Sequence, residues 1–394
     1  MGDVTLSRTP YFLRLLISAW LGRLPTAMAA IAIPLALREV GASYGFIGVA
    51  VGALAVGAAV GSPVLGRYVD RVGQVRVLVP TAVIAAVGFI AIAVAPREPV
   101  VVLAGAVLAG AATPPLEPCL RVLWPDIVGE DRLERAYAVD SAMQEMIFVA
   151  GPLVVTGCVA AISPVFALWT AAVLGLAGVA IFAPAAPVRR WRAQARVPDW
   201  LGPLRSKGLV VVLGALAGNG FAIGVLTVFI VSYAEGHAVP GGAPTLLALN
   251  AGGALVGALA YGMVRWRTQS RQRAVIFAGG MLIAYAMLPI VPSTPYMAGL
   301  MLLTGLFFAP LLTVTFVLIG ELAPRGTSAE AFAWLITLFA CGNSAGAAIV
   351  GIVLDGAGLH WAAACGVLGV GWSLATLLAG YRLLSGLPSR ASAP

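Results

Sequence analysis

Long runs of hydrophobic residues recur along the whole chain, and each is about long enough to cross a lipid bilayer. A hydrocarbon core of roughly 30 Å takes about 20 apolar residues in a helix, and glycine, proline and arginine separate the runs. The pattern predicts twelve helices, at residues 12–37, 43–66, 77–95, 99–121, 136–161, 164–183, 208–233, 244–264, 274–291, 296–320, 328–354 and 360–383. We therefore expect an all-α membrane protein.

The composition points to the same class. Hydrophobic residues make up 60% of the 394 positions and charged residues 10%, whereas an ordinary globular domain has roughly 45–50% and 25%. The net charge of +8 does not indicate nucleic-acid binding, because the cations cluster at the ends of apolar runs. Four cysteines occur singly, so we expect them to pack as small hydrophobic residues and predict no metal and no cofactor: Cys119, Cys158, Cys341 and Cys365.

The distribution of arginine predicts the orientation. With the N-terminus in the cytoplasm, 21 of the 24 cations fall in cytoplasmic loops or at cytoplasmic helix ends. Arg38 and Arg97 are left outside, and Arg23 lies within the first helix. This bias predicts that both termini are cytoplasmic. The use of arginine in place of lysine, with abundant Ala, Gly and Val, indicates a GC-rich bacterial genome and hence the cytoplasmic (inner) membrane.

The chain also repeats itself at an offset of 195 residues. The matched positions include aromatic, proline and acidic residues as well as small ones: Ala136–Ala138 with Ala331–Ala333, Ala150–Gly151 with Ala345–Gly346, Gly110 with Gly305, Pro115 with Pro310, and Asp126 with Glu321. Two parallel halves are a recurring plan of secondary transporters. We predict two six-helix bundles, residues 1–183 and 208–394, joined by a basic cytoplasmic linker at 184–207.

A charged segment between the second and third helices carries the most specific pattern. It reads Gly66-Arg-Tyr-Val-Asp70-Arg71-Val-Gly73-Gln74-Val-Arg76. It resembles the signature loop of the major facilitator superfamily, in which Gly, Asp, a cation, a second Gly and further cations recur at this spacing. Gly66, Asp70, Arg71, Gly73 and Arg76 fit that loop, whereas Gln74 stands where the family usually has arginine. The resemblance implies two six-helix bundles around a central cavity.

The same loop has a physical interpretation. A glycine such as Gly66 lets two helices approach closely, and Gly73 permits a tight turn. Asp70 is suited to accept hydrogen bonds from a helix N-terminus, where the dipole favours an anion. The resemblance implies that this partner is the start of the eleventh helix, Thr327 to Glu330, and that the contact is a latch that opens and closes the cytoplasmic side. The alternative is an ordinary solvated run of charges.

The direction of transport rests on one weaker match. Ala150-Gly151-Pro152 in the fifth helix resembles the antiporter signature of drug exporters in this superfamily. We expect proton-coupled efflux of a small organic molecule. The alternatives are proton-coupled uptake of a sugar or another metabolite by symport, and a channel.

Four ionisable residues within predicted helices are candidates for proton coupling: Glu145, Arg23, Asp140 and Glu117. By family analogy, the first, fourth and fifth helices line the central cavity. A desolvated carboxyl such as Glu145 can bind and release a proton near neutral pH. The alternative for Glu145 is a static ion pair with Arg23. Asp140 and Glu117 have the alternative of being wetted at the interface or pairing with Arg121 or Arg135.

Polar and aromatic residues within apolar helices are candidates for substrate binding. The polar ones are Gln144, Asn219 and Asn343, and the aromatic ones are Phe148, Phe221 and Trp334. Hydrogen bonding between helices is the alternative for the amides, and packing against lipid is the alternative for the rings.

Other classes of protein fit the sequence less well. A phosphate loop ends in Gly-Lys-Ser or Gly-Lys-Thr, and the one lysine, Lys207, has no such context. The loops are poor in His, Asp and Lys, so we do not expect an enzyme. The expected partners are a small-molecule substrate, protons and the lipid bilayer, with no nucleic acid, and we expect a monomer.

Overall fold

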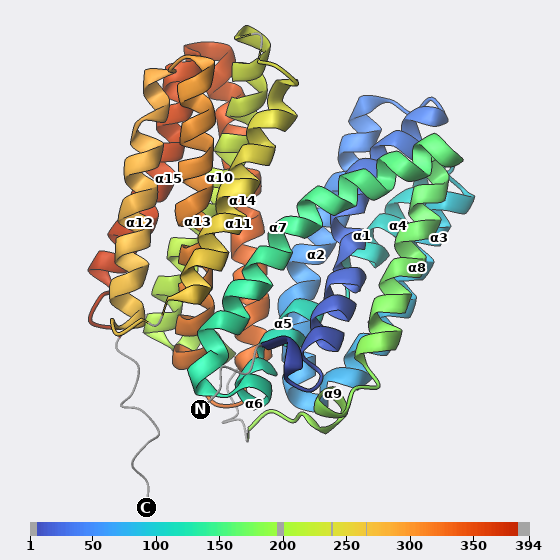
Figure 1. Cartoon of the computed structure of the whole chain (residues 1–394). Coiled ribbons are helices and arrows are strands. Elements are labelled where there is room, and N and C mark those ends of the chain that lie inside the picture. Colours follow the sequence, from blue (N-terminus) through green and yellow to red (C-terminus); the bar gives the residue numbers. More distant parts are fainter. Residues whose placement is uncertain (1–5, 195–200, 238, 265, 385–394) are drawn as a thin grey trace, which may run out of the picture. The chain divides into compact units, whose positions relative to one another are not determined.

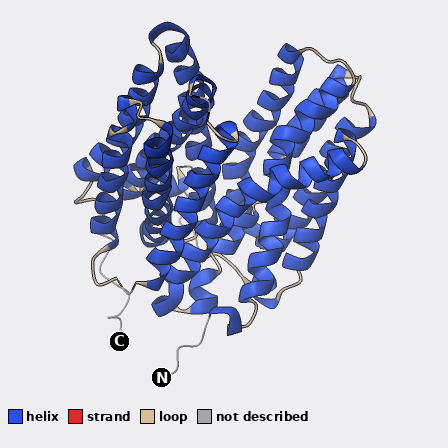
Figure 2. Cartoon of the chain, turned by 45° about the horizontal axis from the view of Figure 1, so that its top comes forward, coloured by secondary structure: helices blue, strands red, loops and turns tan. Residues whose placement is uncertain are grey.

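The computed structural model describes residues 6–194, 201–237, 239–264 and 266–384, and this part of the chain is almost entirely helical (Figures 1 and 2). The longer helices are α1 (Phe12–Glu39), α2 (Tyr44–Val72), α3 (Gln74–Val94), α4 (Pro99–Ala111), α7 (Glu130–Ala161), α8 (Pro164–Phe182), α10 (Lys207–Gly236), α11 (Gly242–Met263), α12 (Ser270–Ala286), α13 (Thr294–Leu322), α14 (Ser328–Ala357) and α15 (Leu359–Ala379). Three of the cations counted above, Arg196, Arg265 and Arg390, lie outside the described residues.

The prediction of an all-α protein with twelve membrane-spanning helices is confirmed. Twelve helical spans in the described part of the chain are long and apolar enough to cross a bilayer. The predicted helix at 99–121 is wrong as a continuous element, because the span Pro99–Val128 consists of α4, α5 (Leu116–Arg121) and α6 (Trp124–Val128). The prolines at 114 and 115 cannot donate backbone hydrogen bonds, which explains the first interruption. The predicted linker contains the short α9 (Ala186–Arg190).

Internal contacts divide the chain into two compact units. Unit 1 comprises Met1–Leu133, Met146–Pro198 and Arg325–Thr337, and unit 2 comprises Glu134–Glu145, Asp199–Pro324 and Leu338–Pro394. The helices α7 and α14 therefore contribute to both units. The predicted bundles at 1–183 and 208–394 follow chain order, and that division stays a prediction.

The helices of each unit pack in the same order. In unit 1, α1 packs on α8, α2 on α4, and α3 on both α4 and α8. In unit 2, α10 packs on α15, α11 on α13, and α12 on both α13 and α15. Each pair in one unit has its counterpart in the other, which is the structural form of the 195-residue repeat.

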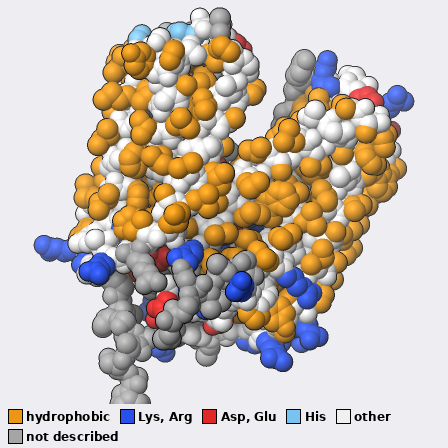
Figure 3. All heavy atoms as spheres, viewed as in Figure 1, with side chains coloured by type: hydrophobic (Ala, Val, Ile, Leu, Met, Phe, Trp, Pro, Cys, Tyr) orange, Lys and Arg blue, Asp and Glu red, His pale blue; other side chains and the backbone are white. Residues whose placement is uncertain are grey.

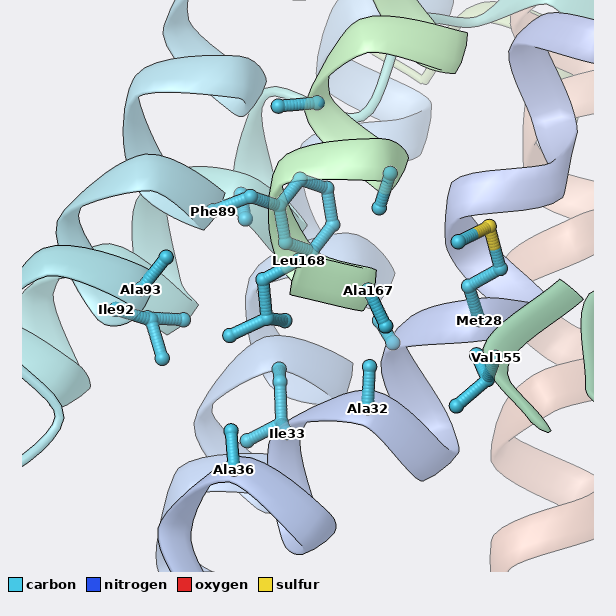
Figure 4. Packing of buried hydrophobic residues seen from close by; sticks show 14 of the residues in the cluster. Met28, Ala32, Ile33, Ala36, Phe89, Ile92, Ala93, Val155, Ala167 and Leu168 are labelled. Atoms are coloured by element: carbon cyan, nitrogen blue, oxygen red, sulfur yellow. The ribbon is translucent and has the colours of Figure 1, made fainter. Parts of the chain in front are cut away.

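The core of unit 1 is built from small and aliphatic side chains. Met28, Ala32 and Ile33 of α1 meet Ala167 and Leu168 of α8 in this cluster (Figure 4). Close backbone approach makes the packing tight, since a methyl group built on Gly178 would collide with the backbone of Gly22. Small residues at a helix contact are typical of membrane proteins, where packing rather than water exclusion favours association.

Hydrophobic side chains also cover much of the outer surface (Figure 3). Val100, Met263 and Ile352 are each at least 75% exposed. A soluble protein would rarely expose so much large apolar surface, so these positions are suited to contact lipid.

Candidate functional site

The carboxylate of Asp70 caps the start of α14 within unit 1. Its Oδ1 accepts a hydrogen bond from the backbone N–H of Ala329 at 3.1 Å, and its Oδ2 accepts one from the N–H of Glu330 at 2.9 Å. The first N–H groups of a helix have no partner inside the helix, and the helix dipole favours an anion there. The contact implied by the family resemblance is thus present, while its action as a latch stays a prediction.

Neighbouring residues strengthen this contact. Arg67 donates to Oε1 of Glu330 from Nε at 2.9 Å and from Nη2 at 2.6 Å. Gly66 lies against α14 so closely that a built Cβ would approach the Cβ of Ala333 to 2.8 Å and the carbonyl oxygen of Ala329 to 2.9 Å. Only glycine fits at position 66 without moving one helix.

The remaining loop residues have different surroundings. Gly73 has φ +90°, a conformation that favours glycine. Arg71 and Arg76 are exposed. Gln74, which stands in place of the family's arginine, is fully buried and donates from Nε2 to the carbonyl oxygen of Cys119 at 3.0 Å. This loop is therefore not an ordinary solvated run of charges, because Asp70 and Gln74 both make specific contacts.

Glu117 lies between two arginines in unit 1. Arg23 Nη2 lies 2.8 Å from Oε2 of Glu117, and Arg121 Nη1 lies 2.5 Å from Oε1. Arg121 is fully buried and Arg23 is 7% exposed. This arrangement corresponds to the alternative in which Glu117 pairs with Arg121, and it adds Arg23 as a second partner.

The residues at the interruption between α4 and α5 line a small cavity in unit 1. Its volume is about 20 Å³, enough for one water molecule. It is lined by Gly22, Pro25, Thr26, Ala82, Ala85, Ala86, Phe89, Thr113, Pro114, Ala171, Ala172 and Gly175. Non-helical backbone at membrane depth is tolerated where protein or water surrounds it, and this cavity offers such a place.

The other two candidates for proton coupling lie on α7. Asp140 is fully buried, and Glu145 is partly exposed. The described residues give the carboxylate of Glu145 neither a hydrogen bond nor an ion pair. The alternative of a static pair with Arg23 is therefore not what the described residues show, since Arg23 pairs with Glu117. Whether either carboxyl group couples transport to protons stays a prediction.

Two of the candidate amides have buried oxygens without a hydrogen-bond donor in the described structure. They are Oε1 of Gln144 and Oδ1 of Asn219, both in unit 2. Buried polar atoms are nearly always hydrogen-bonded in native proteins, so such atoms are suited to bind water or a ligand. Asn343 is partly exposed, and its backbone carbonyl packs against Gly224 of α10.

The three candidate aromatic residues differ in exposure. Phe148 is 59% exposed, whereas Phe221 and Trp334 are partly buried. Phe221 lies between the glycines of two helices, Gly346 of α14 and Gly369 of α15. Helix packing therefore accounts for Phe221, and a role of these rings in binding stays a prediction.

Sequence reasoning missed a second polar cluster, which lies in unit 2. Arg273 donates to both carboxylate oxygens of Glu134, at 2.5 and 2.7 Å, and to the hydroxyl of Tyr261 at 2.6 Å. Ser270 accepts a hydrogen bond from Arg273 at 3.2 Å and donates one to Glu321 at 3.0 Å.

The repeat contains the signal that would have revealed this cluster. At the offset of 195 residues, Glu134 corresponds to Ala329, which bonds Asp70. The loop after α11 has cations but no acid. In the structure, Glu134 at the start of α7 supplies the acid and bonds Arg273 of α12, so the second contact is an ion pair where the first is a carboxylate on backbone N–H groups.

Comparisons with known proteins give one family. Residues 15–324 match the model described as Major Facilitator Superfamily. No curated protein matches the chain.

Several solved structures share the fold. A bacterial homologue of the iron transporter ferroportin in an outward-facing state has a TM-score of 0.73 and 13% identity, covering 94% of this chain and 99% of its own. The human organic anion transporter MFSD10 (TETRAN) has 0.69 and 15%, covering 95% and 100%. A variant of the E. coli fucose:proton symporter, FucP, has 0.70 and 15%, covering 95% and 98%. At these identities the likeness concerns the fold alone.

Proposed function

The chain belongs to the Major Facilitator Superfamily of multi-pass membrane transporters, and on this basis we propose that it exports a small organic molecule in exchange for protons. Alternating access between two conformations would carry out this exchange. We place the protein in the cytoplasmic membrane with both termini inside, as the arginine distribution predicts.

The single observation that carries the proposal is the state of Glu145. Its carboxyl group lies within a membrane-spanning helix, remains partly exposed, and has no partner among the described residues. An intramembrane carboxyl without a fixed partner is costly, and such groups commonly mark proton pathways in transporters. A carboxyl locked in an ion pair would be less suited to gain and lose a proton.

The capped start of α14 supports the conformational part of the proposal. Asp70 and Arg67 on α2 both bond residues of α14, and these contacts are formed by side chains that can separate without unfolding either helix. Capping contacts of this kind contribute about 1 kcal/mol each. A contact of that size is strong enough to favour one conformation and weak enough to break during each transport cycle.

The antiporter-like motif and the solved relatives bear on the cargo and the direction. Gly151 of α7 packs on Ala27 of α1, where a built Cβ would approach to 2.6 Å, so the Gly-Pro pair of the antiporter-like motif has a packing role as well. The solved relatives include a fucose:proton symporter, an organic anion transporter and an iron-transporter homologue by their titles. Uptake by proton symport is therefore the second candidate.

The proposal is tested in two steps. A panel of toxic compounds and sugars first identifies the cargo, as the compound whose content in cells changes on expression. Transport of that cargo is then measured with purified protein in proteoliposomes. Glu145→Gln should then abolish the response of transport to an imposed proton gradient while leaving cargo exchange without a gradient. Glu98→Gln, which changes an exposed acid in a predicted outer loop, is the matched control. Undiminished gradient-driven transport in Glu145→Gln would exclude this residue from coupling.

These two assays also separate export from uptake and a transporter from a channel. Cellular loss of the cargo on expression supports export, and gain supports uptake. Flux that saturates with cargo concentration supports a transporter, whereas flux that rises linearly without coupling supports a channel.

A further inference from the structure

The helix α5 follows a hinge within unit 1. It has six residues, Leu116–Arg121, and Ala112 to Pro115 separate it from α4. Neither proline of this interruption can donate a backbone hydrogen bond. At its other end α5 continues into α6 through a hydrogen-bonded turn, in which the N–H of Val122 bonds the carbonyl of Pro118. α5 and α6 can therefore shift together at the hinge without disrupting the hydrogen bonds of α4.

One face of α5 is attached to α1 by charge and by packing. Glu117 pairs with Arg23 of α1, and Arg121 pairs with the same Glu117 one turn along α5. Leu116 contacts Gly22, the residue beside Arg23. We call Arg23, Glu117 and Arg121 the ion-pair set.

Other parts of α5 contact the elements that hold the cap on α14. The carbonyl of Cys119 accepts the hydrogen bond of Gln74, which directly follows the turn glycine of the Asp70 loop. The guanidinium of Arg121 lies 5.8 Å from the ring centre of Phe332. Phe332 is in the first turns of α14, beyond the two residues whose N–H groups bond Asp70.

We propose that α5 is a lever that transmits changes in the ion-pair set to the contact between Asp70 and α14. Gln74 is the positioning residue on the loop side, and Phe332 is the contact on the helix side. This inference rests on the proposed function only for its purpose, since the connection itself consists of contacts within unit 1.

A physical reason supports this transmission. Arg121 is fully buried, so its guanidinium group interacts with Glu117 through a medium that screens charge weakly. Neutralising the Glu117 carboxylate leaves the like charges of Arg23 and Arg121 near each other. Their repulsion favours a shift of α5. The cavity beside Thr113 and Pro114 provides room at the hinge. Because Gln74 and Phe332 contact α5 directly, the shift would reach both sides of the Asp70 contact.

The test is a double-mutant cycle read by amide hydrogen exchange of residues 328–332 in the full chain. Glu117→Gln should accelerate exchange at the start of α14 by about tenfold, within the range measured for coupled sites. Gln74→Met removes the donor to Cys119 while keeping the side-chain size. In the double variant, Glu117→Gln should accelerate exchange by a smaller factor than it does in the otherwise unchanged chain, because only the contact between Arg121 and Phe332 still transmits the shift.

The chain offers a matched control for this cycle. Gln269 lies 195 residues after Gln74, also at the start of a helix, but it is exposed and bonds Arg271. Gln269→Met should leave exchange at 328–332 unchanged and should leave the effect of Glu117→Gln intact. If Gln74→Met is not recovered as folded protein, Gln74→Asn, whose shorter amide cannot reach Cys119, takes its place.

Independent effects of the two substitutions, multiplying in the double variant, would overturn the lever. So would normal exchange at α14 in Glu117→Gln. The readout requires neither cargo nor a proton gradient, so its outcome is separate from that of Glu145→Gln in the transport assay.

Discussion

The spans Pro99–Val128 and Thr294–Leu322 occupy corresponding places in the two halves of the repeat, yet one is broken and the other is continuous. Both pack in the same way just before the position of the break. A side chain built on Gly110 would collide with the backbone of α2, and one built on Gly305, 195 residues later, would collide with the backbone of α11. The two spans therefore approach their neighbours in the same manner at these glycines.

Both spans also accommodate a proline by the same means. Pro115 and Pro310 cannot bond the carbonyls of Ala111 and Leu306 four residues earlier. Each of these carbonyls lies against a glycine of the neighbouring helix, Gly61 for Ala111 and Gly257 for Leu306. The close Cα–H groups of the glycine partly compensate the missing bond, so one proline does not break the helix.

The difference lies in a single preceding position. Pro114 stands where the second half has Ala309, and it removes a second donor and restricts Thr113 before it. Beyond the break, Glu117 and Arg121 stand where the second half has Leu312 and Phe316. Hinge and charges thus occur together in one half, as the proposed lever requires.

Removing the charge asymmetry should have the largest effect. Glu117→Leu, which installs the residue of the second half, removes the carboxylate that Arg23 and Arg121 both contact. Breaking a buried ion pair from one side costs about 3–5 kcal/mol. We expect much lower recovery of folded protein and a reduced Tm in detergent. The control Leu312→Met conserves volume and should cost less than about 1.5 kcal/mol. A normal Tm for Glu117→Leu would show that the ion-pair set contributes little to stability.

The sequence contained enough information for the helices but not for this asymmetry. Run length and hydropathy are local properties, so all twelve spans were predictable. Glycine and acid spacing likewise identified the Asp70 loop. The two adjacent prolines at 114 and 115 were visible in the sequence, but membrane helices often tolerate proline, and the helix was predicted to run through them.

The partners of the charged residues were not predictable in the same way. Which helix face a side chain occupies depends on helix rotation, which one sequence does not fix. Arg23 pairs with Glu117 instead of Glu145, and Arg273 pairs with Glu134, 139 positions away in the chain. Gln74 departs from the family pattern, yet its amide makes a buried bond that an arginine would not make in the same way.

Introducing the break into the other half should have the next largest effect. Ala309→Pro gives α13 the same Pro-Pro pair as the first half, at a fully buried position. A proline in a helix interior costs about 3 kcal/mol or more. We expect a lower Tm and faster amide exchange confined to residues near 308–311. Ala309→Ser, which keeps the N–H and is nearly as small, serves as the control. Unchanged exchange would mean that residues other than Pro114 cause the break.

Substituting the glycines that contact the carbonyls of Ala111 and Leu306 should lower the stability of the protein by similar amounts. Gly61→Ala and Gly257→Ala each insert a methyl group against a backbone carbonyl that cannot move aside cheaply. Overpacking of this kind costs about 1–3 kcal/mol. We expect similar losses of Tm for the two variants, whereas Gly52→Ala, whose built Cβ meets nothing within 4 Å, should be neutral. Clearly unequal losses would mean that the two prolines are accommodated differently.

The smallest effect on stability and the most informative one on mechanism should come from Pro114→Ala. This substitution makes the first half identical to the second at the deciding position, where Ala309 allows a continuous helix. It restores one backbone donor and removes the restriction on Thr113, so the change in Tm should correspond to about 1 kcal/mol or less in either direction. Amide exchange at 112–116 should slow, because α4 and α5 then share helical hydrogen bonds. If α5 has to move independently of α4, transport should slow while cargo binding is retained. Pro310→Ala is the control, since α13 is already continuous there. Unchanged transport by a variant with slowed exchange would show that the hinge is a property of folding and not of the transport cycle.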